Sequence, residues 1–431
     1  MVRCGASVSN HPLIELRPWR EPCEVFAEYA ARPHCVWLDT AVGSGISIMA
    51  AEPTKIISTS GDPFAVIAEE LASRHVTSGQ PFPTGAAIGY FGYDLKNIVE
   101  RLPANAVDDM GLPHCWFGFY DDLLVFDHAK KEVWEVGDTR AQSTHGVSSR
   151  PRASASGVTS NFTRDSYRAT VLRAKQYIAA GDIYQVNLSQ RFQCDVDASA
   201  PDVYRALRQS NPAPYGAYLD TGEAQILSTS PECFLNIQDR HVITRPIKGT
   251  RARGATPEED ARIAAELLAS PKDNAELVMI TDLERSDLGR VCEFGSVRVS
   301  EMVRVETYAT VHHLVSTVEG LLGSDVSHID CVRACFPGGS ITGAPKIRAM
   351  EIIDELELHA RGVYTGAIGF LGYNGLTHLN IAIRTVVYQR GRLTFHSGGG
   401  IVADSEPDAE YDETLVKAQG ILNAIGQLRI R

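Results

Sequence analysis

Residues 365–375 read TGAIGFLGYNG, and residues 84–94 carry nearly the same run, TGAAIGYFGYD. Both runs alternate glycine with aromatic or aliphatic residues, which is typical of a closely packed strand that ends in a turn. Two interpretations follow from this repeat. The pattern suits any such strand, and its near repetition also fits a duplicated strand unit in a core with two halves.

The remainder of the chain predicts an α+β protein, because strand-like runs come in groups between helices. The helical patterns cover residues 62–74, 163–181, 257–268, 271–288 and 408–425. Asp62 and Thr163 can cap the first two helices, and Gly181 can end the second. The pair Asn374-Gly375 predicts a hairpin turn in the last third of the chain.

Composition limits the possible partners. The 431 residues are 44% hydrophobic and carry a formal charge of -12, without a long Lys/Arg block, so nucleic acid is not expected to be a main partner. No run approaches the roughly 18 apolar residues of a membrane span, and we expect a cytoplasmic protein without a membrane partner. The nine cysteines have no framework spacing and are expected to be reduced, with Cys331 and Cys335 as core side chains.

One segment differs clearly from the others in composition. Residues 139–160 read TRAQSTHGVSSRPRASASGVTS, with many serines and almost no large apolar side chains. Such a composition predicts a flexible linker. It divides the chain into an N-terminal region, 1–138, and a C-terminal region, 161–431.

Two predicted helices carry carboxylates at helical spacing. Glu410, Glu413 and Lys417 share one face of the last helix, and Asp273 and Glu276 lie one turn apart at the start of another. Either face can simply be exposed and salt-bridged. If both helices point into one cavity, their carboxylates suit Mg²⁺, which takes a few oxygen ligands and leaves places for water and an anionic substrate.

Glycine-rich turns and one lysine are further candidates. The run FPGGSITGAPK (336–346) can expose backbone N–H groups to an anion, but it is not a nucleotide-binding Walker loop because Ala-Pro-Lys follows Gly343. The tract 398–400 allows close backbone approach to a ligand. Lys248 follows a strand, and the simplest interpretation is that it is a surface lysine. To act as a nucleophile, it would need burial or a nearby cation that lowers its pKa.

Nine motifs occur together in an order that resembles the chorismate-utilising enzymes, strongly over about 163–431 and more loosely over the N-terminal third. The motifs are NLSQRF (187–192), NPAPYGAYL (211–219), STSPECFL (228–235), PIKGTRARG (246–254), ELVMITDLERSDLGR (276–290), HHLVSTVEG (312–320), FPGGSITGAPK (336–346), AIR (382–384) and GGGIVADSEPDAEYDETLVKA (398–418). The resemblance implies a large two-sheet antiparallel β-sandwich flanked by helices, with 161–431 as the chorismate-binding catalytic domain and 1–138 as the N-terminal component I region.

Two positions bear on which member of the family the chain resembles. Members that add water to chorismate carry a lysine base where this chain has Gln185, and glutamine cannot take a proton from water. Anthranilate-forming members read PIAGT where this chain reads PIKGT, and the lysine form is typical of members that make 4-amino-4-deoxychorismate for 4-aminobenzoate and folate. The resemblance therefore implies attack by Lys248 on C2 of chorismate, followed by ammonia at C4.

The resemblance also implies roles for individual residues. Besides Lys248 as nucleophile, it implies Glu232 as general acid, His313 as an active-site histidine, Glu276 and Glu413 as Mg²⁺ ligands with Glu410 and Asp273 beside them, and Tyr364, Arg384, Lys417, Thr250, Gly398, Gly399 and Gly400 as substrate-binding residues. Two departures from the family pattern are Ser286, where asparagine is usual, and Asp273, where several relatives have glutamate. The segment LDTA (38–41) only partly matches the one that, with NPAPY, binds tryptophan in related chains.

The nitrogen source is expected to be a separate subunit. None of the nine cysteines lies in the Gly-x-Cys-x-Gly elbow of a glutaminase, so the resemblance implies a glutamine amidotransferase partner that supplies ammonia. Two alternatives remain: component I of anthranilate synthase, and a non-catalytic binding subunit with the same fold. The second is disfavoured because the acidic and lysine residues are all present.

Overall fold

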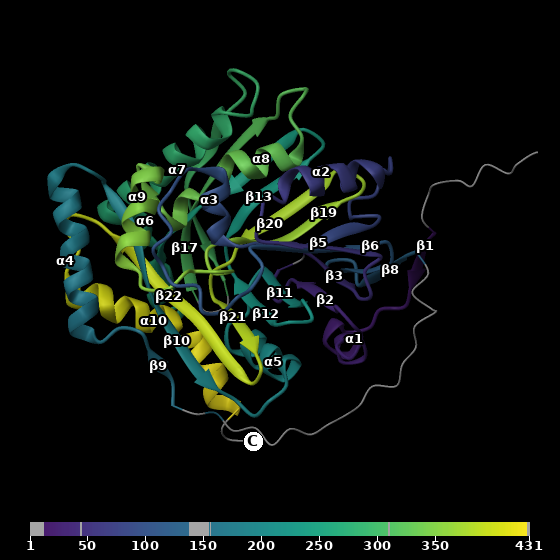
Figure 1. Cartoon of the computed structure of the whole chain (residues 1–431), viewed down its shortest axis with the longest axis horizontal. Coiled ribbons are helices and arrows are strands. Elements are labelled where there is room, and N and C mark those ends of the chain that lie inside the picture. Colours follow the sequence, from purple (N-terminus) through teal and green to yellow (C-terminus); the bar gives the residue numbers. More distant parts are fainter. Residues whose placement is uncertain (1–12, 44, 138–154, 156, 309–310, 429–431) are drawn as a thin grey trace, which may run out of the picture.

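The computed structural model describes residues 13–43, 45–137, 155, 157–308 and 311–428, and their strands form two antiparallel sheets (Figure 1). The first sheet runs in the order β1 (Ile14–Arg17), β8 (Glu132–Val136), β7 (Leu123–Asp127), β3 (Ile46–Ala50), β2 (Val36–Asp39), β11 (Tyr215–Asp220), β12 (Gln225–Ser230), β21 (Thr385–Gln389), β22 (Arg392–Ile401), β10 (Gln185–Asp195) and β18 (Gly343–Ala344), with β9 (Thr159–Ser160) beside β10. The second runs β15 (Ile247–Ala252), β17 (Val311–Leu321), β14 (His241–Arg245), β13 (Cys233–Gln238), β20 (Leu376–Ile381), β19 (Ala367–Gly372), β5 (Ala86–Phe91), β6 (Cys115–Tyr120) and β4 (Lys55–Thr59), with β16 (Arg298–Thr307) beside β17.

The two sheets pack face to face, and helices cover their outer faces. Val36, Ile48, Ile88 and Ile368 come from both sheets and share one buried cluster between them, whereas Trp37, the neighbour of Val36, points to the opposite face, as the period of two in a strand requires. The helices are α1 (Pro22–Tyr29), α2 (Phe64–Ser73), α3 (Lys96–Val99), α4 (Arg164–Ala180), α5 (Ala200–Ser210), α6 (Pro257–Ala269), α7 (Pro271–Gly289), α8 (His328–Cys335), α9 (Lys346–Leu356) and α10 (Pro407–Leu428). The expected α+β sandwich is confirmed.

The repeated sequence forms the middle of the second sheet. Its two copies are β5 and β19, which pair antiparallel with Gly89 directly opposite Gly369. A Cβ on Gly369 would lie 1.9 Å from the carbonyl oxygen of His378, and one on Gly89 would lie 1.9 Å from that of Trp116. The glycines of the repeat are therefore required by the close approach of neighbouring strands.

Segments from both sides of the predicted linker are interleaved in both sheets. β2 pairs with β11 in the first sheet, and β5 pairs with β19 in the second. Most of the linker lies outside the described residues, but its end forms β9, which pairs with Phe192 and Gln193 of β10. The chain therefore returns to the first sheet before α4 begins.

Local capping follows the sequence in most places. Thr163 and Ser166 form a capping box at the start of α4, and Gly181 ends it with φ at 82°. The predicted helix at 62–74 begins later, at Phe64, because Pro63 takes the N-cap position while Asp62 accepts a hydrogen bond from the Phe64 N–H.

Other local predictions are also met. Cys331 and Cys335 are fully buried in the core, as expected. No helix in the described ranges combines the length and apolarity needed to cross a membrane.

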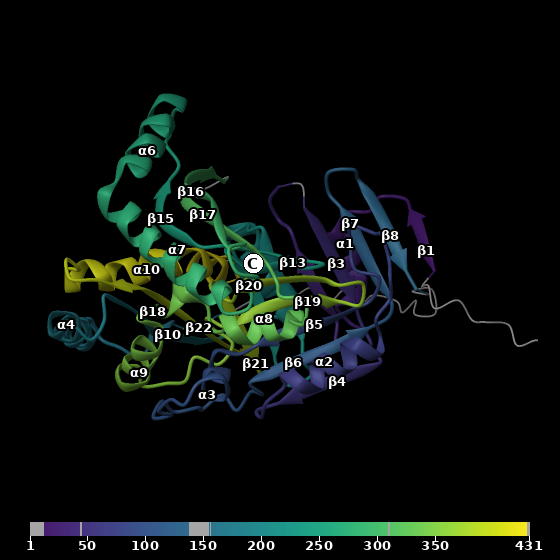
Figure 2. The same ribbon diagram turned by 90° about the horizontal axis from the view of Figure 1, so that it is seen from above.

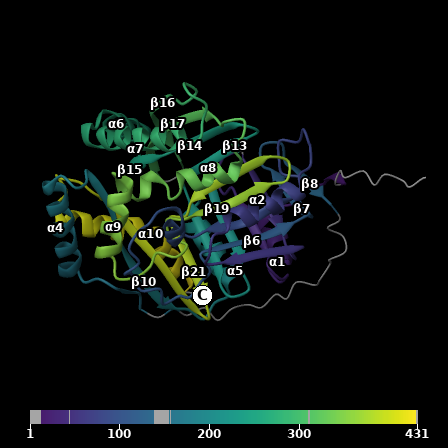
Figure 3. The same ribbon diagram turned by 45° about the horizontal axis from the view of Figure 1, so that its top comes forward.

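The helices with predicted site residues gather at one end of the molecule. In all three views α7, α10 and β10 lie toward one end of the molecule and α1 lies toward the other (Figures 1, 2 and 3). Figures 2 and 3 also place β15 at the first end, and Figure 1 places β2 and β3 toward the other. Contacts of α7 with β15 and of α10 with β22 join these elements. The site is therefore assembled from both sheets and from two helices distant in sequence.

Candidate active site

Lys248 is the centre of a charged cluster. It lies on β15, half-buried, and its Nζ donates a hydrogen bond to the carbonyl oxygen of Ser340 at 3.0 Å. Burial lowers its pKa, opposed by the negative charges of Glu232, Glu276 and Glu413 around it. A lowered pKa increases the fraction of free amine, which is the nucleophilic form.

Glu232 is the buried acid of this cluster. It lies in the connection between β12 and β13, where the Ile381 N–H donates to its backbone carbonyl at 3.0 Å. Burial raises the pKa of its carboxyl group, and contact with Ser340 and the charge of Lys248 act in the opposite direction. A carboxyl group with a raised pKa can hold a proton closer to neutral pH, as a general acid must.

The α10 carboxylates lie beside the glycine tract of β22. A Cβ added to Gly399 would be 3.1 Å from Glu413 Oε1 and 3.5 Å from Glu410 Oε2, so only a glycine leaves this space open. Glu410 is buried and its Oε2 has no hydrogen-bond partner within the described part of the chain. Glu413 forms an ion pair with Lys417 at 2.7 Å.

The α7 carboxylates lie beside the segment that carries Lys248. Burial raises the pKa of Glu276, and Lys248 lowers it. Asp273 forms an ion pair with Arg251 at 2.8 Å, and its Oδ1 would be 3.0 Å from a Cβ on Gly249. Asp273 and Glu276 of α7 thus lie near the segment that carries Lys248, and Glu413 of α10 is close enough to raise the pKa of Lys248.

The donor set suits a hard divalent cation in its chemistry. Carboxylate oxygens from two helices, one of them buried without a partner, are the ligands that Mg²⁺ prefers. Within the described ranges, however, no three His, Cys, Asp or Glu side chains are close enough to form a ready metal site. A cation would have to draw Glu276 and Glu413 together and compete with Lys417.

Arg384 is a half-buried cation without an acidic partner among the described residues. Burial lowers its pKa, and its Nη1 donates to Asn211 Oδ1 at 3.1 Å; among the described residues it forms no ion pair. Its backbone has φ of +49°, and Thr365, which follows Tyr364, has φ of +61°. Such left-handed backbone in non-glycine residues is a feature of ligand sites, and an unpaired guanidinium suits a carboxylate ligand.

Tyr364, His313 and Thr250 complete the set of predicted residues. The Tyr364 ring stacks on His396 of β22 at 4.9 Å between ring centres. His313 Nδ1 lies 2.8 Å from Thr250 Oγ1, and burial together with nearby Arg384 lowers the pKa of His313 to about 4. His313 is therefore neutral at physiological pH and can donate or accept a hydrogen bond but supplies no charge.

Three polar residues here were given no catalytic or binding role from the sequence. Half-buried Asn211 accepts a hydrogen bond from Arg384, Gln185 has both side-chain polar atoms buried beside Gly400 without a partner among the described residues, and Glu284 is a buried acid of α7. Asn211 and Glu284 stand inside quoted motifs. Their polar identity was visible there, but their burial was not.

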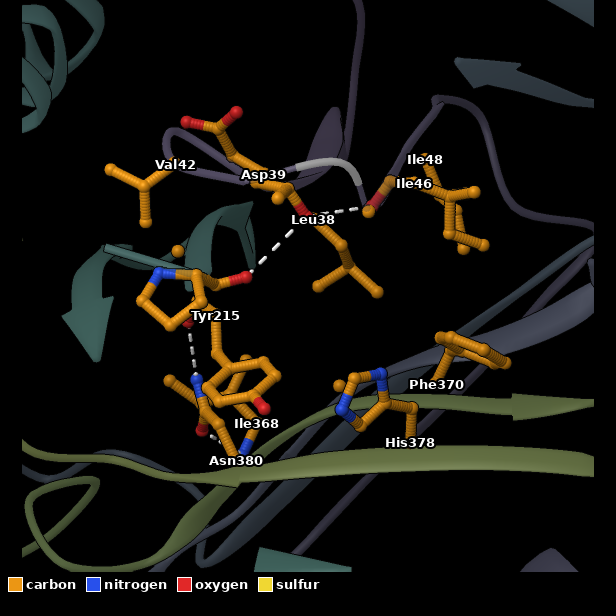
Figure 4. A pocket seen from close by; sticks show the side chains of 15 residues that line it. Leu38, Asp39, Val42, Ile46, Ile48, Tyr215, Ile368, Phe370, His378 and Asn380 are labelled. Carbon is orange, nitrogen blue, oxygen red and sulfur yellow. Dashed lines mark hydrogen bonds between the residues drawn. The ribbon is translucent and has the colours of Figure 1, made fainter. Parts of the chain in front are cut away.

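A separate cavity of about 240 Å³ lies between the two sheets (Figure 4). It is lined by Leu38, Asp39, Thr40, Val42, Gly45, Ile46, Ile48, Pro214, Tyr215, Gly216, Ile368, Gly369, Phe370, His378 and Asn380. The segments LDTA and NPAPY therefore meet at one cavity, although they are far apart in sequence. Thr40 Oγ1 donates to the Ile46 carbonyl at 2.8 Å, and Lys248 is not among the lining residues.

The fold and the site define a class of enzymes that act on chorismate. The family described as chorismate binding enzyme matches residues 33–423, and the chain belongs to it. The chain is therefore a chorismate-utilising enzyme, as the motifs implied.

Individual relatives carry two different names. Aminodeoxychorismate synthase component 1 from Bacillus subtilis (strain 168) is 38% identical, over 92% of both chains. Anthranilate synthase component 1 from Acetivibrio thermocellus is 42% identical, over 80% of this chain and 76% of the relative. The crystal structure of anthranilate synthase component I from Streptococcus pneumoniae TIGR4 has a TM-score of 0.79 at 33% identity and covers 88% of this chain and 92% of that one.

Proposed function

We propose that the chain is component I of an aminodeoxychorismate synthase, which converts chorismate and ammonia to 4-amino-4-deoxychorismate. The observation that carries the proposal is Lys248 itself. Its amine is held by Ser340 among Glu232, Glu276 and Glu413, in surroundings that lower its pKa. A lysine in such surroundings is suited to act as a nucleophile rather than as a surface cation.

In the proposed reaction, Lys248 is the nucleophile and Glu232 is the general acid. The Lys248 amine forms a bond to C2 of chorismate, the ring double bond shifts, and the C4–oxygen bond breaks. Glu232 donates its proton to the departing hydroxyl, which leaves as water. Ammonia then forms a bond at C4, the ring double bond shifts back, and the bond between Lys248 and C2 breaks, which restores the free lysine. The ammonium group formed at C4 returns one proton to the Glu232 carboxylate, so both residues are ready for the next turnover.

The carboxylates of the substrate require cationic partners. Arg384 and Tyr364 are proposed to hold the enolpyruvyl carboxylate, with Lys417 and the Gly398–Gly400 backbone close by. Mg²⁺ held by Glu276 and Glu413, with Glu410 and Asp273 beside them, would supply the positive charge that a carboxylate needs near four acidic side chains. His313, whose Nδ1 lies 2.8 Å from Thr250 Oγ1, is proposed to form a hydrogen bond with the substrate through its other ring nitrogen.

Component I of anthranilate synthase is the second candidate function, and it is favoured by relatives of that name at 42% and 44% identity. The deciding experiment incubates the purified chain with chorismate, Mg²⁺ and ammonium and separates the products by chromatography, with and without a lyase that releases 4-aminobenzoate. We expect the para product. Anthranilate as the main product would assign the chain to the second function, and no turnover would favour a non-catalytic subunit.

Ammonia is proposed to come from a separate glutamine amidotransferase, as the component 1 names of the relatives suggest. The isolated chain should then use ammonium salts, better as pH rises toward the ammonium pKa, because only NH₃ is nucleophilic. It should release no product with glutamine as the sole nitrogen source. Glutamine-dependent turnover by the pure chain would contradict the need for a partner.

A further inference from the structure

Glu284 is a buried carboxyl group of α7 that the proposed reaction leaves without a role. Its side chain is 3% exposed, and its Oε1 accepts a hydrogen bond from the Gly339 N–H at 3.0 Å. Its Oε2 is buried and has no hydrogen-bond partner within the described part of the chain. A buried oxygen without a partner is costly, so a compensating role is expected.

The surroundings of Glu284 favour its uncharged form. Burial, together with the negative charges of Asp287 and Glu232, raises its pKa to about 8, although Lys346 and the hydrogen bond from Gly339 act in the opposite direction. Lys346 is itself engaged, because it pairs with Asp287 and donates to the carbonyl oxygens of Cys335 and Pro337. Within the described ranges, no cation forms an ion pair with Glu284, so a charged Glu284 would not be neutralised by a direct partner there.

The bond from Glu284 reaches the loop that holds Lys248. Gly339 is followed by Ser340, whose carbonyl oxygen accepts from Lys248 Nζ at 3.0 Å and from Asn187 Nδ2 at 2.7 Å. A Cβ on Gly339 would lie 2.7 Å from Leu283 Cδ2 and 3.1 Å from Glu284 Oε1. The glycine thus lets α7 approach the loop closely enough for the Glu284 contact to form.

We infer that Glu284 is a positioning residue for Lys248, which acts by anchoring the Gly339–Ser340 peptide so that the Ser340 carbonyl directs the lysine amine. This inference rests on the proposed function, in which Lys248 is the nucleophile. Glu284 does not touch the substrate. It needs only an acceptor oxygen at the Gly339 N–H and no charge.

The test compares three variants of the full chain. Glu284→Gln keeps an acceptor oxygen and removes the ionisable group, Glu284→Leu keeps similar volume and removes the acceptor, and Asp282→Asn is the control on an exposed position of the same helix. We expect Glu284→Leu to lower kcat at least 10-fold with KM for chorismate changed less than 2-fold, because substrate contacts remain. Glu284→Gln and Asp282→Asn should both stay within 2-fold of the wild type.

Hydrogen exchange supplies a measurement that does not depend on turnover. The Gly339 amide should exchange faster in Glu284→Leu and at the wild-type rate in Glu284→Gln. The inference would be overturned if Glu284→Leu had the wild-type kcat and its Gly339 amide exchanged at the wild-type rate. Equal loss of kcat in Glu284→Gln and Glu284→Leu would also overturn it, because the amide retains the anchor.

Failure of the proposed function has a different outcome. In that case the wild type makes mainly anthranilate, or Lys248→Ala makes the para product at the wild-type rate, whatever the Glu284 variants do. If Lys248→Ala loses the para product and Glu284→Leu changes nothing, the proposed function stands and only the positioning role is wrong.

Discussion

Lys417 Nζ lies 2.7 Å from Glu413 Oε1, one helical turn away on α10, and 3.1 Å from the carbonyl oxygen of Gly398. Burial tends to raise the pKa of Glu413, but the charge and hydrogen bond of Lys417 outweigh it, and the pKa is lowered. The lysine therefore keeps Glu413 ionised and also occupies the oxygen that a cation would use.

Replacement of Lys417 should separate these two effects. In Lys417→Ala we expect tighter Mg²⁺ binding by titration calorimetry, because the competing ammonium is gone, and a KM for chorismate raised about 10-fold, because a cation near the substrate carboxylates is lost. Lys130→Ala, at an exposed position after β7, is the matched control. Unchanged Mg²⁺ affinity in Lys417→Ala would show that Glu413 is not a metal ligand.

Removal of the metal should abolish activity reversibly. Chorismate is a dianion, and Glu276, Glu410 and Glu413 would repel it unless a cation lies between them. EDTA should stop turnover, and added Mg²⁺ should restore it. Glu413→Gln should need far more Mg²⁺ than the wild type, whereas Asp408→Asn, which removes an exposed carboxylate from the same helix, should not. Normal turnover of Glu413→Gln without added metal would refute the metal role of α10.

Lys248→Ala should alter the position of amination and not only the rate. If the Lys248 amine bonds to C2, it expels the 4-hydroxyl group and also blocks ammonia from that carbon. Without it, we expect at least a 10²-fold loss of 4-amino-4-deoxychorismate, with a small gain of the 2-amino isomer or anthranilate, measured by chromatography. Lys248→Arg keeps the charge but not the nucleophile and should lose the para product equally. An undiminished para product from either variant would rule out Lys248 as the nucleophile.

The site residues that sequence could predict are those whose role depends on local spacing or on a whole motif. The Glu413 and Lys417 pair follows from positions one turn apart on a helix, and the structure confirms the contact. The pairing of Asp273 with Arg251 does not follow, because 22 residues separate them and β15 must first fold against α7. For Asp273 the sequence left two alternatives open, an exposed and salt-bridged helix face or a place beside a metal, and it named no partner.

The burial of individual polar side chains could not be predicted from the sequence. The other acidic residues of the same helix range from exposed Asp282 to buried Asp287, so the residue type alone does not show that Glu284 faces inward; its contact with Gly339 does. In the same way, the repeat predicted two similar strands but not their pairing, since antiparallel neighbours are chosen by tertiary packing. The pairing of Gly89 with Gly369 emerges only once both sheets are assembled.

The last prediction tests that close packing of the repeated strands. A Cβ at position 369 would lie 1.9 Å from the His378 carbonyl oxygen and 3.0 Å from the Leu379 Cα, both backbone atoms of β20, so no side-chain movement can make room. We expect Gly369→Ala to lower the free energy of unfolding by about 1–3 kcal/mol or more, as overpacking does. Gly426→Ala is the control, because nothing lies within 4 Å of a Cβ there and alanine favours a helix by up to about 1 kcal/mol over glycine.

Thermal unfolding of the two variants measures the difference, and turnover shows its effect on the site. β20 ends at Ile381, three residues before Arg384, and its Asn380 Nδ2 donates a hydrogen bond to the Tyr215 carbonyl oxygen at 2.8 Å. Displacement of β20 should therefore raise KM for chorismate in Gly369→Ala as well as lower its melting temperature, while Gly426→Ala keeps the wild-type KM and melts no earlier. If Gly369→Ala has the same melting temperature as the wild type, β19 and β20 are not packed as closely as their backbones indicate. The glycines of the repeat would then have another cause.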